Sequence, residues 1–269
     1  MLGTDLVSAC EQAGHEVIGL DLPELDITSH DNTREMIPAC DWLVNCAAYT
    51  DVDGAESHPE EAVAVNAKAV RNLAKLCFSR KIHLLHISTD YVFDGRLKRP
   101  YTEEDYANPL GIYGVSKMAG EEAIREEKGH HIILRTQSLF GMHGRNFVKS
   151  VIERIEKGEE LHVVDDQISS PTYTRHLAEA ILKLLPIDER GLVHVSGTGA
   201  CSWYRFAKAI AKHVEPNAVV KPVKTVDTDR PAPRPAYSVM DSLHFEKWTG
   251  HRMPSWQQGL EEYLAEEGY

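Results

Sequence analysis

The stretch Ile82-His-Leu-Leu-His-Ile-Ser-Thr-Asp90 decides the fold, because it reads as a buried strand that ends in polar residues. Its apolar part is short and has β-branched residues at both ends, which is typical of a parallel strand covered on both faces. A turn-rich loop follows, and Tyr113-Gly-Val-Ser-Lys117 then begins a helix. A strand, a loop and a helix in this order predict one βα unit of a parallel sheet.

The same stretch carries the parts of a proton relay. Helical spacing puts Tyr113 and Lys117 one turn apart on one face, and Thr89 ends the strand before them. A phenol has a pKa of about 10, so it exchanges protons poorly at neutral pH until a nearby cation stabilises its anion. The spacing lets Lys117 supply that cation, and the Thr89 hydroxyl could hold a substrate oxygen in line. The sequence therefore predicts an enzyme that interconverts a carbonyl and an alcohol.

A second pair with the same spacing, Tyr204 and Lys208, serves as an internal control. An apolar stripe with helical period, from Trp203 to Ile210, explains that helix by packing and leaves Lys208 facing solvent. No strand end bearing Ser or Thr lies a short loop before Tyr204. Because bare motif matches are often false, we interpret the second pair as structural.

Outward from this unit, strand and helix patterns alternate as in a doubly wound parallel (Rossmann-type) sheet, so the predicted fold class is α/β. A proline at position 59 is well placed for the first turn of a long helix. The expected helices cover residues 2–13, 33–40, 59–78, 147–157 and a segment that starts near 113. The expected strands cover residues 16–20, 41–47, 82–87, 132–135 and 161–164.

The expected domain division follows from where this alternation loosens. Residues 1–140 are expected to form a dinucleotide-binding domain, and residues 141–269 mainly a substrate-binding domain. Segments such as 173–196 are expected to return to the first domain. The stretch 230–235, Arg-Pro-Ala-Pro-Arg-Pro, is too rich in proline for a helix or a central strand. A smaller, partly interleaved domain that closes over the sheet fits this pattern.

The composition argues against several classes of protein. A formal charge of −12 argues against a nucleic-acid surface, which needs a basic face. No stretch approaches the roughly 18 apolar residues of a membrane span, and no basic signal-peptide region is visible. Five cysteines without a Cys-x-x-Cys pair predict reduced thiols in a cytoplasm. The 14 histidines lack metal-ligand spacing, so they predict no metal site.

Candidate cofactor contacts follow three of the expected strands, because ligands of doubly wound folds lie at the carboxyl ends of strands. These contacts are Asp21, the segment Ala47-Ala-Tyr-Thr50 and the segment Ser88-Thr-Asp90. Asp21 could accept hydrogen bonds from an adenosine ribose, which would favour NAD over its 2′-phosphorylated form, or it could be an ordinary turn residue. Asp26 and Ile27 could touch the adenine or start a turn.

A phosphate-binding turn of the pattern Gly-x-x-Gly-x-x-Gly after a first strand is not found. Gly3 is expected to be the last glycine of that turn, at the start of the first helix. A strand of about 5–6 residues and most of the turn would then precede Met1, unless the protein is a natural variant. Without that central strand, the strand at 16–20 should be separated from the strand at 41–47 by a gap or should have collapsed against it.

With these motifs in view, the chain resembles the extended short-chain dehydrogenase/reductases, most closely the dTDP-4-dehydrorhamnose reductases. The resemblance covers nearly the whole chain, from Gly3 to about Leu264, and its motifs are together highly specific. They are Leu25-Asp-Ile27, Asn45-Cys-Ala-Ala-Tyr-Thr-Asp-Val-Asp53, Ser88-Thr-Asp-Tyr-Val-Phe-Asp-Gly95, Asn108-Pro-Leu-Gly-Ile-Tyr-Gly-Val-Ser-Lys117, Leu134-Arg-Thr136, Asp166-Gln-Ile-Ser-Ser-Pro-Thr172 and Arg234-Pro-Ala-Tyr-Ser238.

The resemblance implies reduction by NADPH or NADH of the C4 ketone of dTDP-4-dehydro-L-rhamnose, which gives dTDP-L-rhamnose. It makes Tyr113 the catalytic acid, Lys117 its modulator and the anchor of the nicotinamide ribose, and Thr89 the hydroxyl that polarises the ketone. A related dehydratase would carry an acidic pair after its threonine, whereas Asp90 is followed here by Tyr91. The expected cofactor-binding residues are Gly3, Asp21, Asp26, Ile27, Ala47, Ala48, Tyr49, Ser88 and Lys117. The expected substrate-binding residues are Thr89, Asp90, Tyr91, Gln167, Thr172, Arg230 and Arg234, the two arginines as a basic clamp for the pyrophosphate.

The resemblance leaves alternatives open. Many family members have an aromatic residue after the Arg-Thr strand, where this chain has Gln137-Ser138, so another nucleotide-4-keto sugar could be the substrate. A protein of another class, a non-catalytic regulatory subunit like the β subunit of methionine adenosyltransferase, shares the pattern. The intact Thr89, Tyr113 and Lys117 favour the enzyme. A Mg²⁺ requirement and a homodimer are both compatible with the resemblance.

Overall fold

A four-stranded parallel sheet forms the centre of the computed structural model, which describes residues 1–269. Its strands lie in the order β1-β2-β3-β8, with β2 and β3 in the middle. The register aligns the ends of the two middle strands, since Thr89 pairs with Thr136. This arrangement confirms the predicted α/β class with a doubly wound sheet. The strands are β1 (Trp42–Asn45), β2 (His83–Thr89), β3 (His131–Thr136) and β8 (Gly191–His194).

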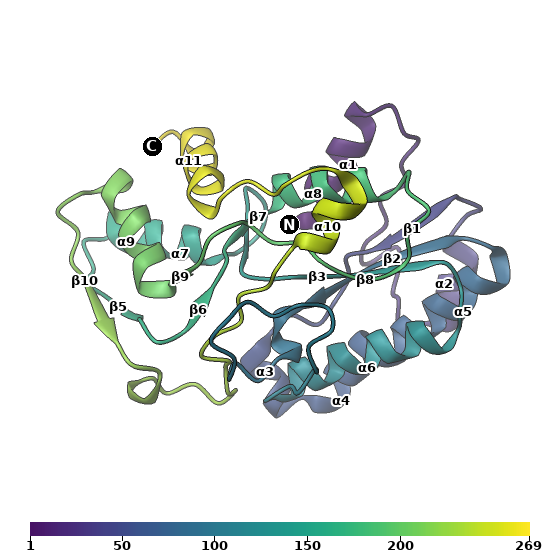
Figure 1. The fold of residues 1–269 in the computed structure, drawn as a ribbon, viewed down its shortest axis with the longest axis horizontal. Coiled ribbons are helices and arrows are strands. Elements are labelled where there is room, and N and C mark those ends of the chain that lie inside the picture. Colours follow the sequence, from purple (N-terminus) through teal and green to yellow (C-terminus); the bar gives the residue numbers. More distant parts are fainter.

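Helices cover both faces of this sheet (Figure 1). Neighbouring residues of a strand point to opposite faces, so Leu84 joins the hydrophobic cluster on one side and Leu85 the cluster on the other. This explains why the strands read as continuous apolar runs. One face carries α1 (Leu2–Gln12), α8 (Thr174–Leu184) and α10 (Leu243–Thr249). The other carries α2 (His30–Met36), α3 (Val52–Ser57), α4 (Pro59–Val63), α5 (Val70–Arg80) and α6 (Ile112–Glu126).

A second hydrophobic core lies beside the sheet, at the left of Figure 1. It joins side chains of three helices, among them Phe206 and Tyr263, whose rings both lie next to the buried Phe140. Its elements are α7 (Phe147–Glu156), α9 (Trp203–Val214), α11 (Trp256–Glu267) and the parallel pair β5 (Leu161–Val164) and β10 (Val220–Val223). Short strand pairs link this core to the sheet: β4 (Leu139–Phe140) with β7 (Thr172–Tyr173), and β6 (Ile168–Ser169) with β9 (Cys201–Ser202).

The long helix expected from Pro59 is present, but it contains a wider turn. A π-helical segment, η1 (Ala64–Ala69), joins α4 to α5. Such π turns insert one extra residue per turn and re-aim the side chains around them. Here the turn carries the buried Asn66, whose contacts are described with the active site.

Two expected elements differ from the structure. Residues 16–20 do not form a strand, because nothing pairs with them and β1, the edge strand, bonds only to β2; Ile18 is 60% exposed. The predicted helix at 33–40 is α2, which begins earlier because Ser29 caps it by accepting the Asn32 N–H. It ends at Met36 because Pro38 disfavours helical geometry at Ile37.

The remaining features concern cysteines and helix length. All five cysteines are free thiols, and Cys10, Cys77 and Cys201 are buried. The proline-rich stretch 230–235 forms neither a helix nor a strand, as predicted. None of the helices combines the length and the apolar character that a membrane crossing requires.

Candidate active site

The hydroxyls of Thr89 and Tyr113 meet where β2 ends and α6 begins. Tyr113 lies in the first turn of α6, whose entry is fixed by Glu56 Oε1, which accepts the Ile112 N–H at 2.8 Å. The Tyr113 ring meets Tyr91 edge to face at 5.4 Å, and Thr89 lies close enough to its hydroxyl to influence the pKa of the phenol. Thr89 Oγ1 also accepts the Tyr91 N–H at 3.2 Å. The structure thus brings together two of the three residues predicted for the relay.

The surroundings of Tyr113 favour its protonated form. Burial raises the pKa of the phenol well above its ordinary value, the hydrogen bond with Thr89 works against this rise, and the Asp90 charge adds to it. Burial also raises the pKa of Asp90 to about 6, although Ser238 and Thr89 donate hydrogen bonds to its carboxylate. The phenol therefore keeps its proton at neutral pH, and its release requires a cation that stabilises the phenolate.

Lys117 is buried one helical turn after Tyr113, and its amine is directed into the sheet. Its Nζ donates to Ile87 O at 2.7 Å and lies 3.3 Å from His86 Nε2. Burial lowers the pKa of Lys117 to about 8, with Glu121 and Cys46 acting in the opposite direction. The amine bonds to β2 and not to Tyr113, so its action on the phenol stays a prediction.

A buried ion pair joins α6 to β3 near the carboxyl ends of β2 and β3. Arg135 on β3 donates to both carboxylate oxygens of Glu121 on α6, at 2.8 and 2.6 Å. Ser88 Oγ donates to the same carboxylate at 2.6 Å, so its hydroxyl is already engaged. Burial favours a raised pKa for Glu121, but the hydrogen bonds and charge of Arg135 outweigh it and lower the pKa. The sequence analysis missed this pair, although an arginine inside an apolar strand was a usable signal.

The chain after β1 is held against α6 by Asn66. The Asn66 side chain accepts the Tyr49 N–H at 2.9 Å, and its amide donates to Tyr49 O and to Ser116 Oγ. Gly120 lets α6 approach closely, because a Cβ there would clash with the Asn66 carbonyl. Ala47 and Ala48, which precede Tyr49, therefore border the carboxyl end of the sheet with small side chains.

The other expected cofactor residues lie along the same edge of the fold. Gly3 is in the first turn of α1, where an added Cβ would come 3.9 Å from Cys46 Cβ. Asp21 is exposed and accepts the N–H of the following Leu22 at 2.8 Å. Asp26 accepts both the N–H and the hydroxyl of Thr28 and so closes a turn, while its contact with an adenine stays a prediction. Ile27 packs against the hydrophobic cluster between α5 and the sheet.

A nicotinamide cofactor fits this donor set at its nicotinamide-ribose end. Tyr113 and Lys117 share one face of α6 beside the carboxyl end of β2, where ligands of such folds bind, and Lys117 Nζ donates there to Ile87 O. The small side chains of Ala47 and Ala48 leave the carboxyl end of β1 open. At the adenine end, the carboxylates of Asp21 and Asp26 bond within their own turns.

A small, partly open pocket lies next to the end of β2. The expected residues Asp90, Tyr91, Gln167 and Arg234 line it. Trp203 was not expected in the pocket, because its place in an apolar stripe indicated packing alone. Its ring does pack against Phe147, with the ring centres 4.6 Å apart. The other lining residues are Ser138, Ile168, Ser169, Pro235 and Ser238.

The remaining expected substrate residues have different surroundings. Arg234 is paired with Asp53 through both guanidinium nitrogens, at 3.0 and 2.8 Å, so its charge is already balanced. Arg230 is exposed in the same loop. Thr172 is fully buried, bonds to Ser170 O and accepts the Gly197 N–H, so its side chain does not reach the pocket. It was expected there because it follows Gln167 in one motif, but the strand pair β4–β7 turns it inward.

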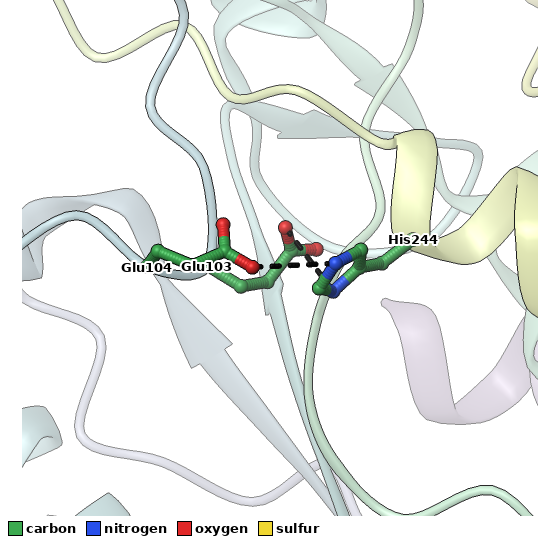
Figure 2. Close-up of side chains that lie close together, drawn as sticks. All are labelled: Glu103, Glu104 and His244. Atoms are coloured by element: carbon green, nitrogen blue, oxygen red, sulfur yellow. Dashed lines mark ion pairs between the residues drawn. The ribbon is translucent and has the colours of Figure 1, made fainter.

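One cluster of potential metal ligands lies elsewhere, in Glu103, Glu104 and His244 (Figure 2). His244 Nδ1 is 3.6 Å from Glu103 Oε2, and its Nε2 is 3.4 Å from Glu104 Oε1. The two ring nitrogens therefore face different carboxylates, while Mg²⁺ prefers oxygen ligands that converge on one point. Glu103 Oε1 also accepts the backbone N–H of His194 at 2.8 Å. The cluster ties α10 to the loop after β2 and gives no support to a Mg²⁺ requirement.

Comparison with known proteins adds four findings. Residues 1–268 match the family described as the RmlD substrate binding domain. The spore coat polysaccharide biosynthesis protein SpsK of Bacillus subtilis is 40% identical over 267 residues, 98% of this chain and 94% of that protein. The dTDP-4-dehydrorhamnose reductase of Mycolicibacterium smegmatis is 38% identical over 272 residues, 98% of this chain and 82% of that protein. The crystal structure of dTDP-4-dehydrorhamnose reductase from Bacillus anthracis in complex with NADP superposes with a TM-score of 0.94 at 38% identity, covering 98% of this chain and 95% of that one.

Proposed function

The chain belongs to the RmlD substrate binding domain family, that of the dTDP-4-dehydrorhamnose reductases, and from this premise we propose that it reduces the C4 ketone of a dTDP-linked 4-keto sugar with NADPH or NADH. The observation that carries the proposal is that Thr89 and Tyr113 lie side by side at the end of β2, next to a pocket lined by Asp90 and Tyr91. The buried Lys117 one turn further on supports it, because a regulatory subunit has no need for these three groups.

In the proposed reaction, the ketone oxygen takes the place between Thr89 and Tyr113. The Thr89 hydroxyl, which now donates to Asp90 Oδ1 at 3.2 Å, would turn its proton toward that oxygen and polarise the carbonyl. When bound, the reduced nicotinamide supplies the hydride to C4. Tyr113 gives its hydroxyl proton to the oxygen as negative charge develops there, and the resulting phenolate is stabilised by the Lys117 ammonium. One hydride and one proton turn the ketone into the alcohol.

The two hydrophobic cores would carry the binding sites of different ligands. We assign the cofactor to residues 1–140, together with returning segments such as 173–196, and the nucleotide sugar mainly to residues 141–269. Support comes from β8, which pairs with β3, and from the pocket, whose walls come from both parts. For the pyrophosphate, Arg230 is the free charge, whereas Arg234 is held by Asp53 and lines the pocket beside Tyr91.

The sugar we propose is dTDP-4-dehydro-L-rhamnose, with dTDP-L-rhamnose as the product. A second candidate, another dTDP-4-keto sugar, is favoured by one observation. Ser138 lines the pocket at a position where the family resemblance predicts an aromatic residue, and its hydroxyl bonds to Ser169 Oγ at 2.8 Å. A polar wall at this point would accept a sugar with a different pattern of hydroxyls.

The test is reduction of defined 4-keto sugars by the purified 269-residue protein. Oxidation of NADPH or NADH is followed by absorbance, and the sugar product is identified by NMR. We expect turnover with dTDP-4-dehydro-L-rhamnose and formation of dTDP-L-rhamnose. Turnover with a different dTDP-4-keto sugar alone would select the second candidate, and no turnover with any of them by a protein that binds the cofactor would contradict the proposal.

A further inference from the structure

A buried chain of polar groups runs from the backbone after β1 to Lys117. Asn45 Oδ1 accepts the Ala47 N–H at 3.1 Å, and Asn45 Nδ2 lies 3.0 Å from His86 Nδ1. His86 Nε2 lies 3.3 Å from Lys117 Nζ, which donates to Ile87 O at 2.7 Å. Asn45, His86 and Lys117 are each at most 5% exposed, so water does not satisfy these groups.

The backbone N–H at one end fixes the direction of every bond in this chain. The Ala47 N–H can only donate, so the side-chain oxygen of Asn45 must face it and the Asn45 amide nitrogen must face His86. The Asn45 N–H then needs a lone pair on His86 Nδ1. Burial, and after it the charge of Lys117, lowers the pKa of His86 well below its ordinary value, so the ring is neutral. A neutral ring with a lone pair on Nδ1 carries its proton on Nε2, which points at Lys117.

Because the His86 Nε2–H points at Lys117, it favours one of the two protonation states of that lysine over the other. An ammonium ion has three donors and no acceptor, so its hydrogens would oppose the His86 Nε2–H. A neutral amine has a lone pair that accepts the Nε2–H, while one of its own hydrogens donates to Ile87 O. The amine satisfies the whole chain, whereas the ammonium leaves one pair of donors facing each other.

We propose that Asn45 and His86 are positioning residues that hold a hydrogen-bond donor against Lys117 and so favour its neutral amine over its ammonium ion. The inference rests on the proposed function for its meaning, because there the Lys117 ammonium stabilises the Tyr113 phenolate. This series of hydrogen bonds from Asn45 through His86 then determines the pH at which Lys117 loses its proton. A group that changes protonation near neutral pH is suited to proton delivery during turnover.

The other groups around Lys117 do not explain this preference. Glu121, one turn further along α6, favours the ammonium, but Arg135 balances its charge. Cys46, at the end of β1, is a neutral thiol whose pKa burial raises to about 12. Burial itself disfavours the ammonium, and the directed chain from Asn45 adds to that effect.

The direct test is the position of the His86 proton, read from the ¹⁵N chemical shifts of its ring in the full-length protein. We expect the proton on Nε2 in the wild type. Asn45→Asp replaces the donor by an acceptor of the same shape and should move the proton to Nδ1. A wild-type proton on Nδ1 would overturn the inference. This measurement does not depend on turnover, so it separates failure of the inference from failure of the proposed function.

The kinetic test is the alkaline limb of kcat/KM against pH. Asn45→Asp should move this limb upward by about one to two pH units, because His86 Nε2 would then accept from the ammonium. Asn45→Leu removes the amide donor without adding charge and should move the limb in the same direction. His83→Gln is the matched control, since His83 lies on the same strand but stacks on His130 at 4.0 Å, and it should leave the limb in place. A shift in Asn45→Asp alone would assign the effect to the added charge and overturn the inference.

Discussion

Two helices of this protein carry the same Tyr-x-x-x-Lys spacing, and they differ in what surrounds it. On α6, Tyr113 meets the Thr89 hydroxyl and Lys117 is buried against β2. On α9, Lys208 is exposed, and its Nζ lies 5.9 Å from the centre of the Tyr204 ring, a loose cation–π contact. The spacing sets only which side chains share a helix face, whereas the strand end beside the helix supplies the other half of the chemistry.

The difference extends below the two helices. Under α6 lie buried polar groups with defined partners, such as the pair of Glu121 with Arg135. Under α9 lies an apolar core that contains Phe206 and Ile210. A buried polar network is costly unless every member is satisfied, so its presence marks a place where position is controlled. A Tyr-x-x-x-Lys motif therefore indicates a function only where buried polar groups orient its side chains.

The largest expected effect separates the two lysines. Lys117→Met should lower kcat by about 10²–10⁴-fold, the range of general acid–base catalysis, because the phenolate of Tyr113 loses its cation. Lys208→Met should leave kcat near that of the wild type. Both values come from steady-state turnover with a saturating 4-keto sugar. Similar losses in the two variants would remove the distinction between the helices.

The next effect concerns the buried ion pair that joins α6 to β3. Glu121→Gln should lower the free energy of unfolding by about 3–5 kcal/mol, because it leaves the buried Arg135 charge without its partner. The matched control is Glu266→Gln on α11, which breaks an exposed pair with Arg175 and should cost about 0–1 kcal/mol. Urea unfolding measures both. Equal losses would show that the pair below α6 supports it no more than a surface contact does.

A smaller effect comes from Asp90, and its sign depends on pH. The folded protein raises its pKa to about 6, so the native carboxyl binds its proton more tightly than the unfolded one, and stability is lost as pH rises from about 4 to about 6. Asp90→Asn removes this loss and should raise the free energy of unfolding by about 2–3 kcal/mol above pH 7, with little change near pH 4.

Asp166 serves as a control, because its pKa is shifted in the opposite direction to that of Asp90. Burial favours a raised pKa there, but hydrogen bonds from Thr225 outweigh it and lower the pKa, so its stabilisation is lost as pH falls through the native pKa. Asp166→Asn should therefore destabilise the protein at neutral pH. Thermal unfolding at a series of pH values gives both profiles. Profiles of the same sign would contradict the different surroundings of the two acids.

Much of the α6 region could be predicted from the sequence because its signals are local. The apolar run before Thr89 and the helical spacing of Tyr113 and Lys117 depend only on neighbouring residues. The strand expected at 16–20 failed because a strand exists only when another strand pairs with it, which periodicity does not report. The start of α2 was missed because the Ser29 cap was not recognised.

The rest of the site depends on contacts between distant residues. Arg234 and Asp53 pair across 181 positions of sequence, and Asn45 reaches His86 across 41. No local pattern links these partners, so the sequence indicated Arg234 as a free charge and left His86 without a role. Trp203 was interpreted as packing because the first residue of an amphipathic helix can both join a core and face a pocket.

We propose that its position beside the strand end, and not the Tyr-x-x-x-Lys spacing, makes Tyr113 the proton donor. The most direct measurement compares Tyr113→Phe with Tyr204→Phe in reduction of dTDP-4-dehydro-L-rhamnose, with cofactor binding measured on each protein. We expect Tyr113→Phe to lose about 10²–10⁴-fold in kcat while it still binds the cofactor, and Tyr204→Phe to turn over like the wild type. Equal losses in the two variants, or full turnover by Tyr113→Phe, would contradict it.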